Sequence, residues 1–101
     1  MFVLMKQLAV YILECSDGTY YTGVTNDPER RLLEHNEGIN EDSYTHSRRP
    51  VKIMWCEFYS SPMLAIMTEK KIKRWSHAKK KAIIENRWED LKVLSKKKFK
   101  K

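Results

Sequence analysis

The chain has 101 residues, a formal net charge of +7 and a hydrophobic content of 42%. This length accommodates one domain with a modest core and excludes a second. The hydrophobic content is that of an ordinary globular protein, and the charge makes phosphates, polyanions and acidic membranes candidate partners without indicating a fold. We expect a single domain over residues 1–94 and a basic, disordered tail over residues 95–101.

The apolar run at the N-terminus lacks the features of a signal sequence. Lys6 interrupts it, no cleavage site follows, and the run continues into a strand pattern. No stretch approaches the roughly 18 apolar residues that a membrane span needs. Cys15 and Cys56 form no CxxC pair, which argues against a zinc site or a disulfide framework. The sequence therefore predicts a cytoplasmic protein without a membrane partner.

The first third of the chain predicts a β-hairpin followed by a helix. Residues 8–15 and 19–24 are rich in Val, Ile, Tyr and Thr, and only residues 16–18 separate them. An Asn-Asp-Pro sequence then supplies a helix start, and Gly38 supplies a stop. We expect this helix over residues 28–37.

The length of the hairpin loop decides which side chains share a face of the sheet. A two-residue loop would place Tyr11 and Tyr21 on opposite faces, whereas a three-residue loop would place them on one face. We favour the three-residue loop, because Gly18 can adopt the left-handed conformation that closes it. Gly23 would then lie opposite Tyr11, and we expect it to leave an open spot beside the phenol for a water or a phosphate oxygen.

Arg31 and His35 are spaced i, i+4 on the first predicted helix and therefore project from one face, while Leu32 and Leu33 are expected to turn toward the core. One interpretation is a solvated basic face. The alternative is that Arg31 neutralises a phosphate and His35 moves a proton, since a guanidinium matches phosphate geometry and imidazole titrates near neutrality.

The second half of the chain predicts a loop, a strand and two helices. Residues 39–49 are polar and have no apolar period, whereas residues 51–59 alternate loosely and indicate a third strand. Cap signals precede helices expected over about residues 63–75 and 76–85. The order β-β-α-β-α-α predicts an α/β (α+β) domain, in which a three-stranded sheet, expected to be antiparallel, packs against helices.

Glu69 is the residue of the second predicted helix that packing alone explains least. At 100° per residue it falls on the broad side expected to face the sheet. That side carries Leu64, Ala65, Ile66, Ile72 and Trp75. Lys73 lies near the same edge, so a salt bridge is one explanation, but carboxylates are seldom buried without a partner or a metal. One carboxylate can hold Mg²⁺ when waters and phosphate oxygens fill the other positions.

Together these residues resemble the motifs of the GIY-YIG endonuclease superfamily, and most closely those of its small stand-alone bacterial members. The stretches VYI at residues 10–12 and YTG at residues 21–23 look like the family's two name-giving motifs, with Tyr11 and Tyr21 as the motif tyrosines. The polar residues that follow are Arg31, His35, Glu69 and Asn86. The resemblance covers residues 9–91, with Ala-Val in place of Gly-Ile and Thr22 in place of the isoleucine of YIG.

The resemblance implies a GIY-YIG fold that hydrolyses DNA phosphodiester bonds in repair or recombination, with one Mg²⁺ or Mn²⁺ ion on Glu69 and no small-molecule cofactor. The implied catalytic residues are Tyr11, Tyr21, Arg31, His35, Glu69 and Asn86. Tyr11 would be the general base, Arg31 would steady the transition state, and the remaining residues would position water or phosphate. A tyrosine with its ordinary pKa of about 10 is a poor base at neutral pH, so His35 is an alternative.

Basic residues in the loop and the last helices are expected to contact the nucleic-acid backbone in a salt-dependent way. They are Arg48, Arg49, Lys70, Lys73, Arg74, Lys79 and Lys80. A second hypothesis is a non-catalytic nucleic-acid-binding module that keeps the fold. A third is an RNA- or ribosome-associated protein, which the charge permits and no RNA-binding motif supports.

Overall fold

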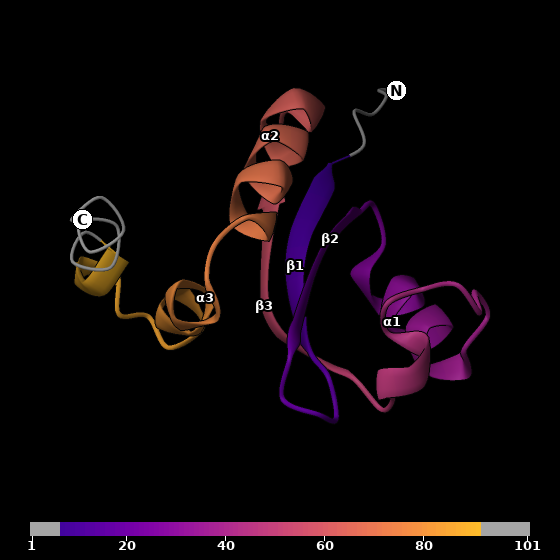
Figure 1. The fold of residues 1–101 in the computed structure, drawn as a ribbon. Helices are drawn as coiled ribbons and strands as arrows, with labels where there is room; N and C mark the ends of the chain where they lie inside the picture. The colour runs from indigo at the N-terminus through magenta and orange to yellow at the C-terminus, as the bar shows by residue number, and fades with distance from the viewer. Residues whose placement is uncertain (1–6, 92–101) are drawn as a thin grey trace, which may run out of the picture.

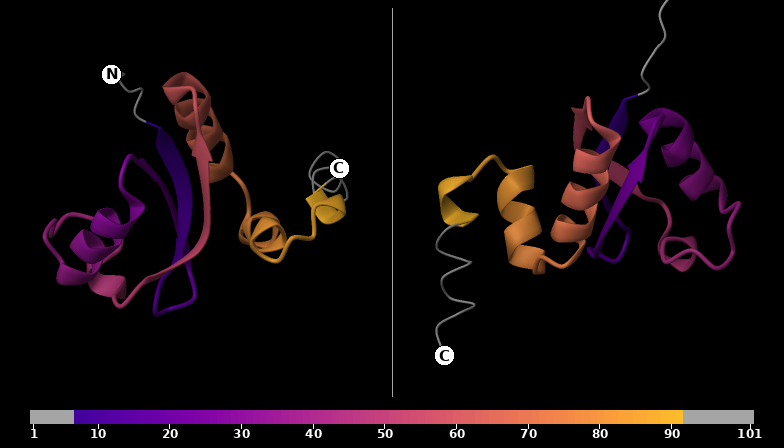
Figure 2. Two further views of the ribbon diagram at one scale, coloured as in Figure 1. Left: turned by 180° about the vertical axis from the view of Figure 1, so that it is seen from behind. Right: turned by 90° about the horizontal axis from the view of Figure 1, so that it is seen from above.

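The computed structural model describes residues 7–91, which form a three-stranded sheet with helices on both faces (Figure 1). Helix α1 (Pro28–Glu37) covers one face, and helices α2 (Pro62–Lys73) and α3 (His77–Ile84) cover the other (Figure 2). This confirms the predicted α+β class and element order. The predicted tail at residues 95–101 lies outside the described residues.

The sheet consists of β1 (Leu8–Glu14), β2 (Tyr20–Thr25) and β3 (Lys52–Tyr59) in the order β2-β1-β3. Both neighbouring pairs are antiparallel, as expected. The central strand β1 has five consecutive buried residues, because one neighbouring strand lies on each side and helices cover both faces. Alternate residues of β1 therefore supply two separate cores.

The hairpin has the predicted three-residue register. Tyr11 pairs with Gly23 and Leu13 pairs with Tyr21, so both tyrosines lie on one face. Gly18 has a φ of +85°, in the left-handed region that glycine adopts without steric cost. Its amide donates to the carbonyl of Cys15 at 2.9 Å.

Helix α1 has the predicted bounds. Asp27 accepts a hydrogen bond from the amide of Arg30 at 3.1 Å, and Gly38 ends the helix with a φ of +69°. Leu32 packs toward the sheet, but Leu33 is 61% exposed, so the prediction for Leu33 was wrong. Consecutive helical residues point 100° apart, so Leu33 turns outward when Leu32 faces the sheet.

Helices α2 and α3 begin at serine caps, as predicted: Ser61 accepts from the amide of Leu64, and Ser76 from the amide of Lys79. The buried residues of α2 are Ala65, Glu69 and Ile72. The helical wheel was correct for these three residues. It was wrong for Leu64 and Ile66, which are exposed because only a narrow stripe of α2 contacts the sheet.

Two apolar clusters fill the two faces. Beneath α2 and α3 the buried members are Val10, Ile12, Ala65, Ile72 and Ile83. Beneath α1 the buried members are Tyr11, Leu13, Cys15 and Val51. Both cysteines are free. No helix within residues 7–91 has the length and apolar character needed to cross a membrane.

The segment between α1 and β3 is a loop that includes a short 3₁₀ helix, η1 (His46–Arg48). Asn36 anchors the end of this loop to α1, since its side chain donates to the carbonyl of Val51 at 3.0 Å and accepts from the amide of Val51 at 2.8 Å. The amide of Ser16 also donates to the carbonyl of Arg48 at 2.9 Å. The loop is thus fastened to both the helix and the hairpin.

Candidate active site

The structure brings four of the six predicted catalytic residues together on the sheet face beneath α1: Tyr11, Tyr21, Arg31 and His35. The Tyr11 hydroxyl lies 3.2 Å from His35 Nε2. The Tyr21 ring packs edge-on against His35, with ring centroids 5.3 Å apart, and lies 6.4 Å from the Tyr11 ring. The i, i+4 pair on α1 therefore faces the strand tyrosines rather than forming a solvated basic face.

Gly23 allows the Tyr11 phenol to lie across β2. A Cβ built at Gly23 would come within 2.6 Å of Tyr11 Cζ and closer still to the hydroxyl oxygen. The open spot that we expected beside the phenol is therefore absent, because the phenol itself fills it. A side chain at this position would have to displace Tyr11.

Tyr11 is a protonated phenol in this environment. Its side chain is 1% exposed, and this burial together with the nearby Tyr21 raises its pKa to about 12. The charge of Arg31 and a hydrogen bond from it act in the opposite direction but do not outweigh burial. A nearby cation such as Arg31 favours phenolate, yet the phenol keeps its proton at neutral pH.

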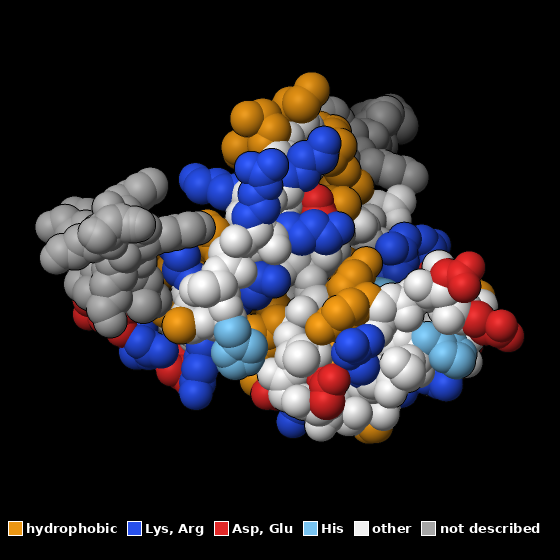
Figure 3. All heavy atoms as spheres, viewed as in Figure 1, with side chains coloured by type: hydrophobic (Ala, Val, Ile, Leu, Met, Phe, Trp, Pro, Cys, Tyr) orange, Lys and Arg blue, Asp and Glu red, His pale blue; other side chains and the backbone are white. Residues whose placement is uncertain are grey.

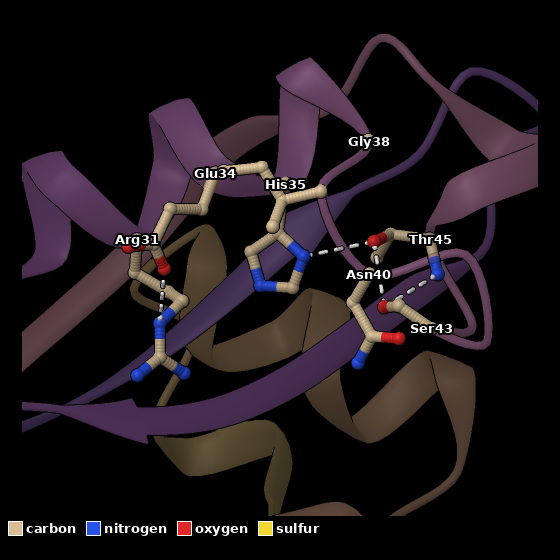
Figure 4. Close-up of a pocket in the computed structure, with 8 residues that line it drawn as sticks. Arg31, Glu34, His35, Gly38, Asn40, Ser43 and Thr45 are labelled. Atoms are coloured by element: carbon tan, nitrogen blue, oxygen red, sulfur yellow. Dashed lines mark hydrogen bonds and ion pairs between the residues drawn. The ribbon is translucent and has the colours of Figure 1, made fainter.

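His35 is held between the sheet and the loop. Burial and the charge of Arg31 lower its pKa, with Glu34 acting in the opposite direction, so the neutral imidazole is favoured at pH 7. Its Nδ1 lies 2.8 Å from the hydroxyl oxygen of Thr45, a fully buried loop residue. Thr45 Oγ1 in turn lies 3.0 Å from Ser43 Oγ (Figure 4).

Thr45 and Ser43 were not among the residues predicted from sequence. They lie in a polar segment without an apolar period, and nothing local in the sequence connects them to His35. A hollow of about 190 Å³ opens beside this cluster, with Arg31, His35, Ser43 and Thr45 among its lining residues (Figure 4). Arg31 is 3.2 Å from Glu34 Oε1 and remains partly exposed to this hollow.

Glu69 faces the sheet and forms an ion pair with Lys73, and the sequence suggested both. It is 8% exposed, and Lys73 Nζ lies 3.2 Å from its Oε2. It is also near enough to Tyr11 for its charge to contribute to the raised pKa of the phenol. Within residues 7–91 no group of three His, Cys, Asp or Glu side chains could hold a metal ion.

Glu69 is the one carboxylate among the predicted catalytic residues, so a divalent ion bound there would take few protein ligands. Mg²⁺ commonly binds through one or two carboxylates and completes its octahedral shell with waters and substrate phosphates. A structural zinc site would instead need four protein ligands of the His or Cys type. A divalent ion bound at Glu69 would need waters or phosphate oxygens at its other positions, and Lys73 would have to release the carboxylate oxygen.

The described contacts of Asn86 do not involve Tyr11, Tyr21, Arg31 or His35. Asn86 is exposed and has a φ of +61° immediately beyond α3, where its amide donates to the carbonyl of Ile83 at 3.1 Å. Its side chain accepts a hydrogen bond from Trp88 Nε1 at 3.2 Å. This is the geometry of a left-handed helix end, which asparagine tolerates better than most residues.

The predicted nucleic-acid-binding residues divide into two groups. Lys70, Lys73 and Arg74 are exposed on the last turns of α2, where Lys and Arg side chains gather around a small acidic patch (Figure 3). Lys80 is 9% exposed, and burial together with Lys73 lowers its pKa. Lys80 is therefore less accessible to a nucleic-acid backbone than we expected.

The other three basic residues make contacts within the protein. Arg48 forms an ion pair with Asp17 at 3.1 Å and lies 4.0 Å from the centre of the Tyr44 ring. Arg49 donates to the carbonyl of His46 at 2.7 Å. Lys79 Nζ lies 4.6 Å from the centre of the Trp75 ring. Arg48 and Arg49 thus hold the loop in place, whatever else they contact.

Comparison with known proteins identifies the family. Residues 7–82 match the GIY-YIG catalytic domain, a span that includes every predicted catalytic residue except Asn86. A UPF0213 protein of Halobacterium salinarum is 47% identical over 74 residues, which cover 73% of this chain and 95% of the relative. A UPF0213 protein of Syntrophus aciditrophicus is 48% identical over 80 residues, covering 79% and 92%.

Solved structures agree with this relationship. A solution NMR structure of a protein from E. faecalis is 35% identical, with a TM-score of 0.57 and coverage of 80% of this chain and 85% of the other. The UPF0213 protein from Bacillus halodurans, also solved by NMR, is 35% identical with a TM-score of 0.52, covering 78% and 83%. The resemblance drawn from the motif residues is confirmed, and this chain belongs to the GIY-YIG catalytic domain family.

Proposed function

We propose that this chain is a metal-dependent endonuclease that hydrolyses DNA phosphodiester bonds, with a cytoplasmic role in DNA repair or recombination. The observation that carries the proposal is the convergence of Arg31 and His35 with Tyr11 and Tyr21 beside an open hollow. A guanidinium, a neutral imidazole and two phenols supply the charge stabilisation and proton transfer that phosphodiester hydrolysis needs.

Family membership supports the same reaction class. GIY-YIG domains are nuclease domains that act on nucleic acids and generally use a divalent metal ion. The UPF0213 relatives carry no more specific activity in their names. The substrate type and the ion in this chain therefore rest on the site chemistry described above.

We assign the proton transfer to Tyr11 and His35 as a pair. With a pKa of about 12, only about one Tyr11 side chain in 10⁵ would be a phenolate at pH 7, so a preformed phenolate is scarce. His35 Nε2 lies within hydrogen-bond reach of the phenol and is neutral at this pH. The attacking water can pass a proton to Tyr11 as Tyr11 passes its own proton to His35, which becomes imidazolium.

Charge stabilisation falls to Arg31 and Glu69. The Arg31 guanidinium is partly exposed beside Tyr11 and can donate to two oxygens of one phosphate. A divalent ion held by Glu69 would neutralise charge on the phosphate and leaving oxygen. Tyr21 is in contact with His35 and only partly buried, which suits it to positioning the phosphate or water.

Substrate affinity would come mainly from the exposed cations of α2. Lys70 and Lys73 lie near Glu69 at the end of α2, and Arg74 follows as the C-cap. Contacts of these residues with the phosphate backbone would release counterions. Binding should weaken steeply with salt and depend little on sequence. Lys73 would also exchange its bond to Glu69 for a phosphate when a cation binds.

One observation favours a second candidate, a non-catalytic nucleic-acid-binding module. Tyr11 is 1% exposed and Glu69 is already paired with Lys73, so both groups are occupied within the protein. A chain that never releases these contacts would keep its basic surface and lose cleavage. The two candidates differ in whether Glu69 and Tyr11 matter for more than folding.

The deciding experiment incubates the protein with plasmid, single-stranded and branched DNA in Mg²⁺ or Mn²⁺. Glu69→Gln and Tyr11→Phe are each expected to lower the cleavage rate by about 10²- to 10⁴-fold, because they remove the metal ligand and the proton acceptor. Glu57→Gln and Tyr59→Phe are matched controls, since they change an exposed carboxylate and a half-buried phenol of β3. Both controls should cut like the wild type.

Other outcomes discriminate among the readings. Cleavage that survives in Glu69→Gln would remove the metal assignment. Salt-sensitive DNA binding by the wild type without cleavage of any substrate would establish the binding module instead. A gel-based assay read alongside circular dichroism separates loss of chemistry from loss of fold.

A further inference from the structure

A line of hydrogen-bonding groups runs from the central strand through α1 into the loop. Tyr11 Oη lies 3.2 Å from His35 Nε2, His35 Nδ1 lies 2.8 Å from Thr45 Oγ1, and Thr45 Oγ1 lies 3.0 Å from Ser43 Oγ. Each neutral group in such a line can be donor or acceptor, so distances alone permit either direction. The surroundings of the two ends decide between the directions.

The Tyr11 end requires that the phenol donate. Tyr11 is protonated and buried, so its hydroxyl proton needs an acceptor. Arg31 cannot accept, because a guanidinium only donates. Among the described contacts of the hydroxyl, His35 Nε2 is the remaining acceptor, so Nε2 must present its lone pair. A proton on Nε2 would leave a buried phenol proton without a partner.

The contacts of His35 with the loop have the same donor-to-acceptor direction, from Tyr11 toward Ser43. With its lone pair on Nε2, a neutral His35 carries its proton on Nδ1 and donates it to Thr45 Oγ1. Thr45 then donates its hydroxyl proton to Ser43 Oγ, which also accepts from the amide of Thr45 at 3.3 Å. The arrangement leaves none of these buried protons unpaired.

We propose that Thr45 is a positioning residue that holds His35 in the Nδ1–H tautomer, so that the Nε2 lone pair faces the Tyr11 hydroxyl. The part of this inference that concerns catalysis rests on the proposed function. The tautomer itself does not, because it follows from contacts of the protein alone. Thr45 would act through His35 and would not touch the substrate.

The other groups around His35 cannot replace Thr45 in this role. Tyr21 meets the ring edge-on, and Tyr11 lies on the Nε2 side. Arg31 and Glu34 on the same helix influence the imidazole through their charges, in opposite directions. No described contact other than the Thr45 hydroxyl reaches Nδ1. Ser43 contacts Thr45 and not His35, so it lies one hydrogen bond further along the line.

The test reads the histidine tautomer directly, by NMR of the ¹⁵N-labelled full chain. Long-range correlations from the ring protons distinguish a protonated Nδ1 from a protonated Nε2. In the wild type at pH 7.5, we expect His35 to show a protonated Nδ1 and an unprotonated Nε2. A protonated Nε2 in the wild type would overturn the proposal, whether or not the protein cuts DNA.

Two variants separate positioning from packing. Thr45→Val keeps the shape of the side chain but removes the hydroxyl, so the Nδ1 proton of His35 loses its acceptor. The Nε2–H tautomer should therefore gain population, at the expense of the hydrogen bond from the Tyr11 phenol. Thr45→Ser keeps the hydroxyl and should retain the wild-type pattern. An unchanged tautomer in a folded Thr45→Val would refute the role of the hydroxyl. If Thr45→Val does not fold, the tautomers of the wild type and of Thr45→Ser decide the question.

Activity provides an additional readout if the chain cleaves DNA. Thr45→Val should lower kcat on the order of 10- to 100-fold with little change in KM, by analogy with the loss of hydrogen-bond partners that orient metal-ligating histidines. Thr45→Ser should recover most of that loss. An absence of cleavage in every protein would count against the proposed function, while the NMR result would still test the tautomer.

Discussion

The two faces of the sheet are built from the same strands but serve different purposes. Beneath α2 and α3, Val10 and Ile12 meet aliphatic side chains in a cluster of buried residues. Beneath α1, Tyr11 meets His35 and Arg31, and α1 itself contains no buried residue. Successive residues of β1 face these two environments in turn, because the side chains of a strand point alternately to opposite faces of the sheet.

This difference shows how a small domain can keep charged groups near a buried centre. Helix α1 shields the tyrosines although none of its own residues is fully buried, so Arg31 and His35 remain partly accessible to solvent. The opposite face supplies mainly apolar burial, and its buried polar or charged residues are Thr22, Glu69 and Lys80. We therefore expect changes on the α2 and α3 face to affect mainly folding, and changes on the α1 face to affect mainly proton transfer.

The strongest challenge to the apolar face is Ile12→Ala. Ile12 is fully buried, so the loss of methyl and methylene groups and the cavity left behind should lower the free energy of unfolding by about 2 to 5 kcal/mol. Urea denaturation measures this effect. The NMR titration of His35 in the folded variant should match the wild type. A shifted His35 pKa would show that the two faces are coupled.

Gly23→Ala tests the α1 face in the same way. The new Cβ would collide with the Tyr11 ring, because built atoms come within 2.6 Å of Tyr11 Cζ. Overpacking of this kind should lower the free energy of unfolding by about 1 to 3 kcal/mol. It should also break the hydrogen bond between Tyr11 and His35. Denaturation and the His35 tautomer report the two effects. A variant with wild-type values for both would show that the phenol has room to move.

The high pKa of Tyr11 predicts a loss of stability in alkali. A phenol that binds its proton more tightly in the folded state contributes stability below pH 10, and this contribution is lost as the pH rises from 10 toward 12. Between pH 9 and pH 11 the loss should be about 1.4 kcal/mol. Tyr11→Phe should lack this part of the pH dependence. Parallel denaturation curves of the two proteins at each pH provide the measurement.

Thr22→Val should give the smallest effect, and in the stabilising direction. Thr22 lies on the α2 and α3 face, where the family has the isoleucine of YIG, and its hydroxyl is buried without a hydrogen-bond partner within the described residues. Removing an unpaired buried hydroxyl should raise the free energy of unfolding by about 1 kcal/mol. A destabilised variant would reveal a partner for this hydroxyl.

Much of the fold and part of the site could be predicted from local sequence. The three-residue hairpin loop followed from Gly18, and it placed Tyr11 and Tyr21 on one face. Serine, aspartate and proline signals located the helix starts, and the helical wheel placed Glu69 among the buried residues of α2. These features depend on neighbours in the chain, so residue order is sufficient to reveal them.

The errors concern contacts between distant segments. Sequence reasoning left an open spot at Gly23, although the Tyr11 ring fills that space. It did not find Thr45, which reaches His35 from ten residues away in another segment. It also turned Leu33, Leu64 and Ile66 inward, because a wheel gives directions but not how wide a stripe the sheet covers.

The sequence by itself determined the element order, the hairpin register and the family, because turns, caps and motif spacing act over a few residues. Only the tertiary structure decided how the polar residues work together. It buried Tyr11 and thereby kept its proton in place, and it brought the loop against α1 so that Thr45 meets His35. Burial and hydrogen-bond direction depend on every element packed around a group, which no local pattern contains.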